Sequence, residues 1–94
     1  MKLKQKASAK MHRRYILLSK TDKKTIERVV LDYIGILGWA EAAPVFVSDD
    51  WIENGQIILA VERKSLEKVR ASFEMSNEKI KILRVSGTLK GLKK

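Results

Sequence analysis

The sequence predicts an α+β fold, a two-layer sandwich in which helices cover one face of a four-stranded sheet. Four short apolar runs with the composition of strands alternate with two longer segments in which apolar residues recur every three or four positions. An Asn-Gly pair marks a chain reversal between the second and third runs. The chain has 94 residues and no cysteine, so it is one small domain without disulfides.

The first half of the chain predicts one strand and one helix. Residues 13–19 are apolar on both faces of an extended segment, which favours a central strand. Thr21 or Asp22 can cap the helix that follows, and Gly38 is its predicted end. One stripe of this helix is expected to face the core, namely Ile26, Val29, Val30, Tyr33, Ile34 and Leu37.

The second and third strands are predicted on either side of a turn. Pro44 suits the start of a strand over residues 45–48, which continues less regularly through residues 49–53. The Asn54-Gly55 pair then reverses the chain. Residues 56–62 form the third strand, which is again apolar on both faces.

The last third predicts a helix, a strand and a short terminal helix. The second helix is expected from Ser65 to about Met75, and the fourth strand covers residues 79–85. Leu83 is expected in the core of the sandwich. Thr88 can cap a short C-terminal helix that turns its leucines toward the body and its lysines outward.

This order of elements is typical of the ferredoxin-like or RNA-recognition-motif-like sandwich with a four-stranded antiparallel sheet. We expect the first and third strands at the centre and parallel to each other, with the fourth antiparallel beside the first. The domain is expected to span residues 13–94, after a basic and flexible arm of residues 1–12. The aliphatic, helix-free face of the sheet is expected to be uncovered and to contact another protein.

The net charge of +9 lies at the two ends of the chain. The first fourteen residues hold six bases and the last eight hold three, without an acid in either segment, while the other eleven bases match the eleven acids. The predicted topology brings both ends together as one patch, with Arg63 and Lys64 toward the opposite end of the sheet as weaker candidates. Such clustering suits a polyanion, because it releases counterions from phosphates. A solubilising tail is the alternative interpretation.

Several classes of function are disfavoured by the sequence. It contains no recognisable nucleophile–base pair, metal-ligand cluster or glycine-rich phosphate loop, so no catalytic or metal-binding residue is predicted. No apolar run approaches the length of a membrane span, and the lack of cysteine fits a cytoplasmic location. Tyr15 is the only aromatic residue on the two central strands, which favours phosphate contacts over base stacking on the sheet.

Three stretches together resemble the archaeal and eukaryal ribonuclease P protein component 2 family. They are RRYI at 13–16, VERK at 61–64 leading into VRA at 69–71, and RVSGTLK at 84–90, followed by further lysines. The resemblance covers roughly residues 13–94. Members of this family are small αβ-sandwich subunits of the ribonucleoprotein that removes the 5′ leader from precursor tRNA.

The resemblance implies a non-catalytic RNA-binding subunit of ribonuclease P. The catalyst would be the partner RNA with its magnesium ions, the protein itself would bind no cofactor, and the protein partners would be component 3 and a second component 2 within a heterotetramer. The alternative is a ligand-sensing or regulatory module of the same fold without nucleic acid. The basic patch and the resemblance together predict the RNA contacts Arg13, Arg14, Tyr15, Arg63, Lys64, Ser86, Gly87, Thr88, Lys90, Lys93 and Lys94.

Overall fold

The computed structural model describes residues 12–19, 21–53, 55–78 and 80–93. Its elements follow in the order β1 (Arg13–Ser19), α2 (Lys23–Ala42), β2 (Val45–Val47), β3 (Gln56–Glu62), a 3₁₀ turn (Arg63–Ser65), α3 (Leu66–Met75), β4 (Lys81–Ser86) and α4 (Leu89–Lys93).

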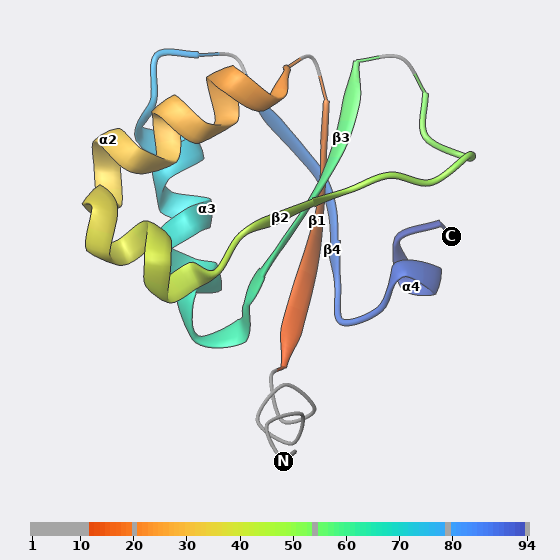
Figure 1. Cartoon of the computed structure of the whole chain (residues 1–94). Helices are drawn as coiled ribbons and strands as arrows, with labels where there is room; N and C mark the ends of the chain where they lie inside the picture. The colour runs from red at the N-terminus through yellow and green to blue at the C-terminus, as the bar shows by residue number, and fades with distance from the viewer. Residues whose placement is uncertain (1–11, 20, 54, 79, 94) are drawn as a thin grey trace.

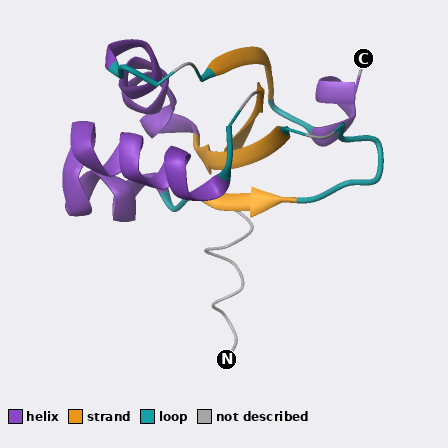
Figure 2. Ribbon diagram, turned by 90° about the horizontal axis from the view of Figure 1, so that it is seen from above, coloured by secondary structure: helices purple, strands orange, loops and turns teal. Residues whose placement is uncertain are grey.

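The four strands form one sheet in the order β2-β3-β1-β4, and every neighbouring pair is antiparallel. The helices α2 and α3 cover one face of this sheet, while the short α4 lies on the other side (Figures 1 and 2). This arrangement confirms the predicted α+β sandwich with a short C-terminal helix, and it is compatible with the ferredoxin-like fold.

The prediction that the first and third strands run parallel is wrong. In the structure β1 and β3 are antiparallel, with Arg13 opposite Glu62 and Ser19 opposite Gln56. The crossover through α2 brings β2 into the direction of β1, and the short connection after β2 then reverses the chain into β3. As a consequence, β3 ends where β1 begins.

The main core lies between the sheet and the helix layer formed by α2 and α3. Alternate residues of the central strands point into this core, because successive side chains of a strand face opposite sides. The helix α3 turns Val69 and Phe73 inward. The buried members of the core are Ile16, Leu18, Ile26, Val29, Val30, Ala42, Leu59, Val61, Val69 and Phe73.

The helix α2 is longer than predicted and is bent. It does not end at Gly38 but continues to Ala42, with a break in the helical conformation at Gly35, where φ is 77°. Glycine adopts this left-handed conformation without the steric cost that a side chain would add. Because the chain turns at Gly35, the predicted apolar stripe does not continue to its end, and Tyr33 and Leu37 are exposed rather than in the core.

The connection from β2 to β3 is mostly loop. The strand β2 ends at Val47. The prediction that the strand includes residue 48 and continues less regularly through residues 49–53 is therefore wrong. Gly55 has the positive φ of 82° that suits a tight reversal, while Asn54 lies outside the described residues. Trp51 and Ile52 of this loop pack on the helix-free face of the sheet.

The pairing of β1 with β4 contains a bulge. Leu17 lies opposite Arg84 but Leu18 lies opposite Ile82, so Leu83 is the extra residue. The prediction that Leu83 belongs to the core is wrong, since its side chain is 42% exposed. The extra residue shifts the alternation of side chains between the two faces along β4. The prediction of a regular strand over residues 79–85 did not include this shift.

Candidate nucleic-acid interface

Three strand ends meet at one end of the sheet. Arg13, at the start of β1, lies opposite Glu62 at the end of β3, and Tyr15 lies opposite Ser86 at the end of β4. In Figure 1 this is the lower end, from which the chain turns into α3 and into α4. The predicted neighbourhood of the first strand's start and the fourth strand's end is therefore confirmed. Residues 1–11 of the predicted arm, Lys79 and Lys94 lie outside the described part of the chain.

The prediction that Arg63 and Lys64 lie toward the opposite end of the sheet is wrong. The backbone N–H of Arg63 donates to the carbonyl of His12 over 2.8 Å. The carboxylate of Glu62 accepts from the backbone N–H of Lys64, also over 2.8 Å. Both residues follow β3, whose antiparallel direction returns them to the start of β1. We call the cations gathered here the cationic edge: Arg13, Arg14, Arg63, Lys64 and Lys90.

The two arginines of β1 are held by local hydrogen bonds. Arg13 Nη1 donates to the carbonyl of Ala43 over 3.1 Å, which ties the start of β1 to the end of α2. Arg14 Nη1 donates to the carbonyl of Arg13 over 3.2 Å, and a Cβ built on Gly87 would lie 3.4 Å from this nitrogen. A guanidinium carries five N–H donors, so each of these side chains keeps donors for a ligand.

The predicted Ser-Gly-Thr turn sets the position of α4. The hydroxyl of Ser86 accepts from the backbone N–H of Thr88 over 3.2 Å, and the hydroxyl of Thr88 accepts from the N–H of Gly91 over 3.0 Å. The second bond confirms Thr88 as the cap of α4. A Cβ on Gly91 would collide with the side chain of Ser86, so glycine permits the close approach that keeps Lys90 beside the edge.

The face of the sheet opposite α2 and α3 was predicted to be uncovered, but α4 and the β2–β3 loop cover part of it. Leu92 of α4 packs on Leu17 and Ile58, and these three residues form a second, smaller buried cluster. Tyr15 and Trp51 pack against this cluster with Val47, Ile52 and Leu89. As predicted, the leucines of α4 face the body and its described lysines are exposed. Tyr15 is therefore part of the packing on this face, which α4 and the β2–β3 loop partly cover.

Lys93 lies one helical turn beyond Lys90 on α4, near the β2–β3 loop. The pKa of Asp49 in this loop is below its ordinary value, first because the backbone N–H of Asp50 donates to its carboxylate over 2.8 Å. Burial opposes this shift, and a hydrogen bond from Trp51 and the positive charge of Lys93 lower the pKa by smaller amounts. The predicted lysine tail thus divides, with Lys90 at the edge and Lys93 beside the loop.

Three salt bridges lie in the helix layer, whereas the described residues offer no salt bridge to any cation of the edge. Arg28 of α2 and Glu78 are joined at 2.8 Å, which raises the pKa of Arg28. The other two salt bridges are also in this layer, namely Lys68–Glu41 at 3.8 Å and Arg70–Glu67 at 3.7 Å. The edge therefore retains its positive charge for a ligand.

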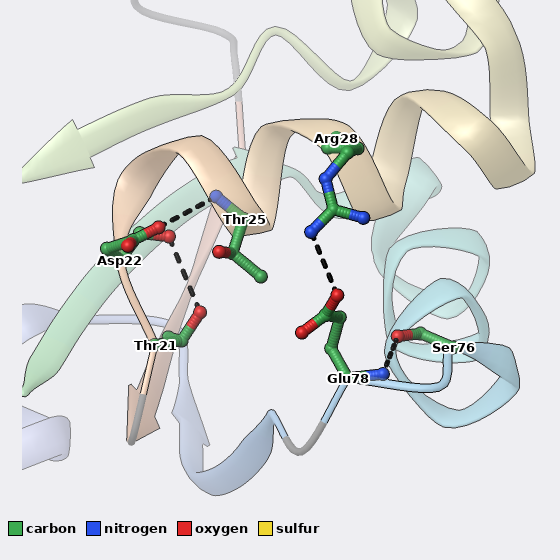
Figure 3. A network of polar contacts seen from close by, with 6 residues as sticks. All are labelled: Thr21, Asp22, Thr25, Arg28, Ser76 and Glu78. Atoms are coloured by element: carbon green, nitrogen blue, oxygen red, sulfur yellow. Dashed lines mark hydrogen bonds and ion pairs between the residues drawn. The ribbon is translucent and has the colours of Figure 1, made fainter.

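Figure 3 shows the Arg28–Glu78 pair together with the polar contacts at the start of α2 and after α3. The carboxylate of Asp22 accepts from the N–H of Thr25 over 2.8 Å, which caps α2 as predicted and lowers the pKa of Asp22. Glu78, the partner of Arg28, donates its backbone N–H to the hydroxyl of Ser76 over 2.8 Å. This network links the start of α2 to the segment that follows α3.

An exposed apolar surface on the helix layer was not predicted. Ile36 and Leu37, directly after the bend at Gly35, are 77% and 81% exposed. Tyr33 and Met75 are also largely exposed and both line a groove between α2 and α3. The sequence signal for the bend in α2 was Gly35 in the middle of the apolar stripe, because glycine is unfavourable in the interior of a helix.

Comparison of the chain with models of known protein families and with curated proteins gives no match. The resemblance to ribonuclease P component 2 therefore stays a prediction.

Within residues 12–19, 21–53, 55–78 and 80–93, no three acidic or histidine side chains come together in a way that suits a metal ion. No helix of the same residues combines the length and hydropathy needed to cross a membrane.

Proposed function

We propose that this protein is a non-catalytic RNA-binding subunit of ribonuclease P, which supports the catalytic RNA in removing the 5′ leader from precursor tRNA. The observation that carries the proposal is the cationic edge. It collects side chains from the start of β1, the end of β3 and the start of α4, and none of them has an acidic partner among the described residues. The sequence motifs that resemble component 2 supply the choice of ribonucleoprotein.

A phosphate backbone is the ligand that fits such an edge best. Unpaired guanidinium and ammonium groups bind phosphate oxygens by charge-assisted hydrogen bonds. The five cations of the edge supply more than half of the net charge of +9, so their clustering strengthens the attraction at this place. Magnesium belongs, in this proposal, to the partner RNA, and the location of the complex is the cytoplasm.

The proposed protein partners are component 3 and a second copy of this chain. Support comes from the exposed apolar side chains of Tyr33, Ile36, Leu37 and Met75 on α2 and α3, since apolar surface left exposed on a small domain often marks a protein contact. Sedimentation of the purified chain, compared with its Ile36→Ser/Leu37→Ser variant, tests self-association. A monomer for both proteins at high micromolar concentration would remove the second copy from the proposal.

RNA binding as a function of salt tests the central proposal. If about five phosphates are neutralised, the slope of log affinity against log salt is about −4 to −5. The triple variant Arg63→Ala/Lys64→Ala/Lys90→Ala removes three exposed cations of the edge and is expected to reduce that slope by about 2 to 3.

The matched control is Lys23→Ala/Lys24→Ala/Lys68→Ala, which removes three exposed cations from the helix layer. It has the same net charge as the edge variant, so equal losses in both would mean that only total charge matters. Undetectable RNA binding by the wild-type chain, or a flat salt response, would overturn the proposed function.

A further inference from the structure

A recess of about 440 Å³ lies on the face of the sheet opposite α2 and α3, between α4, the β2–β3 loop and β4. Its volume is in the range of small-ligand sites. Leu17, Leu83 and Leu92 give it an apolar lining, and Trp51 contributes an aromatic side chain from the loop. Because Leu83 remains 42% exposed, α4 and the loop leave this part of the face accessible.

Two cations line the same recess from different elements. Arg84 comes from β4, where the bulge places it opposite Leu17 and on this face of the sheet. Lys93 comes from the last turn of α4. Both side chains are exposed, and neither forms a salt bridge with the residues that the structure describes.

Polar groups of the loop and of β3 complete the lining. The side-chain oxygen of Gln56 accepts from the backbone N–H of Glu53 over 3.2 Å, which fixes the amide with its NH₂ group left to donate. The carboxylate of Glu53 accepts no hydrogen bond from the described residues and can accept from N–H groups of a ligand. The recess thus combines an apolar lining, an aromatic ring, one donor, one acceptor and two cations.

The recess continues from the cationic edge along α4. Lys90 at the edge and Lys93 at the recess are three residues apart on this helix, so their Cβ atoms are about 5–6 Å apart. A chain of phosphates lying on the edge can therefore reach the recess without a gap in positive charge.

We propose that this recess holds one unpaired nucleotide of an RNA chain, with its base against Trp51 and the leucines and its phosphate between Arg84 and Lys93. This site is additional to the phosphate contacts of the edge, and it rests on the proposed function. An unstacked base is recognised in proteins by stacking on an aromatic or guanidinium plane together with hydrogen bonds to its edge. A base inside a duplex cannot enter the recess, so the site selects single-stranded RNA.

Fluorescence of Trp51 tests the site in the full chain with Trp39→Phe, which leaves Trp51 as the only tryptophan. A six-nucleotide single strand, a duplex of the same length and adenosine monophosphate are titrated at one salt concentration. The single strand is expected to quench Trp51 in a saturable way, while the duplex binds without quenching. The free nucleotide is expected to bind more weakly than the single strand, because it lacks the contacts of the edge.

Binding of the same three ligands to variants of the recess is measured by calorimetry, which does not need Trp51 as a reporter. Trp51→Leu should weaken the single strand by about five- to hundredfold, the range of one base–aromatic stack, and leave duplex binding unchanged. Arg84→Ala and Lys93→Ala should each weaken the single strand more than the duplex. Trp51→Leu keeps an apolar side chain for packing, and circular dichroism checks that it folds. Lys81→Ala is the matched control, because it removes an exposed cation of β4 that does not line the recess.

The outcomes separate the two proposals. Single-strand binding without quenching, and with no loss in the three recess variants, would overturn the nucleotide site but not the edge. A free nucleotide that binds as tightly as the single strand would also overturn it, because the site would then not belong to an RNA chain. No binding of either RNA would overturn the proposed function and, with it, this inference.

Discussion

The two faces of the sheet are closed by different means. The face under α2 and α3 has ten buried residues contributed by both helices and both central strands. On the other face three residues form a buried cluster and Ala60 is also buried, and a five-residue helix and a loop close this face. The first face holds the fold together, whereas the second is only partly covered and keeps the recess and Leu83 accessible. A small sandwich can therefore devote one face to stability and leave part of the other for a ligand.

Leu18→Ala should have the largest effect on stability, because this residue lies fully buried between β1 and the helix layer. We expect a loss of about 2 to 5 kcal/mol in the free energy of unfolding, from lost contacts and the cavity left behind. Urea denaturation at neutral pH measures it. A loss below about 1 kcal/mol would show that the helix-covered face is not the main core.

Leu92→Ala probes the second face and should cost less, about 1 to 2 kcal/mol, although Leu92 is also buried. The short α4 can detach without unfolding of the sheet, and the free energy of that local opening limits the loss. Hydrogen exchange should accelerate in residues 89–93 while β1 and β3 stay protected. Equal acceleration in all three elements would mean that the two faces unfold as one unit.

Neighbouring residues of β4 allow a direct comparison of the two faces. Ile82 packs against the main core, whereas Leu83 is the exposed residue of the bulge. Leu83→Ala should change the free energy of unfolding by less than about 1 kcal/mol, and Ile82→Ala should cost more. The order is read from parallel urea titrations of both variants, and the reverse order would contradict the bulge assignment.

The smallest expected effect is a dependence on pH that comes from the cap of α2. The N–H of Thr25 lowers the pKa of Asp22 in the folded chain. The contribution of the ionised Asp22 carboxylate to stability is therefore fully present above about pH 4, the pKa of an unperturbed Asp. This contribution is lost as the pH falls through the lower pKa that Asp22 has in the folded chain.

Asp22→Asn is the control for this effect, because the amide oxygen can still cap the helix but does not titrate. The difference in Tm between wild type and Asp22→Asn should shrink as the pH is lowered from 5 to about 2. A difference that stays constant over this range would show that the Asp22 carboxylate does not contribute through its charge.

The sequence predicts local elements and their order well, because periodicity and caps are local properties. The strands β1 and β3, the helix α3 and the caps Asp22 and Thr88 follow directly from such signals. The bend at Gly35 and the bulge at Leu83 were missed, since each replaces a regular repeat that the apolar pattern alone suggests.

The candidate site was predicted only in part, because it depends on the direction of strands rather than on any one stretch. The start of β1 and the end of β4 meet as predicted, since Tyr15 lies opposite Ser86 and the side chain of Arg14 lies beside Gly87. Arg63 and Lys64 were placed at the wrong end because β3 was oriented parallel to β1. Arg84 was not considered, since its position on the recess depends on the bulge.

The bulge also makes β4 the strand whose length can change. Its extra residue has no partner on β1, whereas pairing between β1 and β3 is continuous from Arg13 to Ser19. A chain without Leu83 would restore regular pairing and keep Arg84 and Val85 on their present faces, whereas loss of one residue from the middle of β1 would exchange inside and outside for half of that strand. We expect the deletion in β4 to fold and the deletion in β1 to fail, which circular dichroism of the two chains would decide.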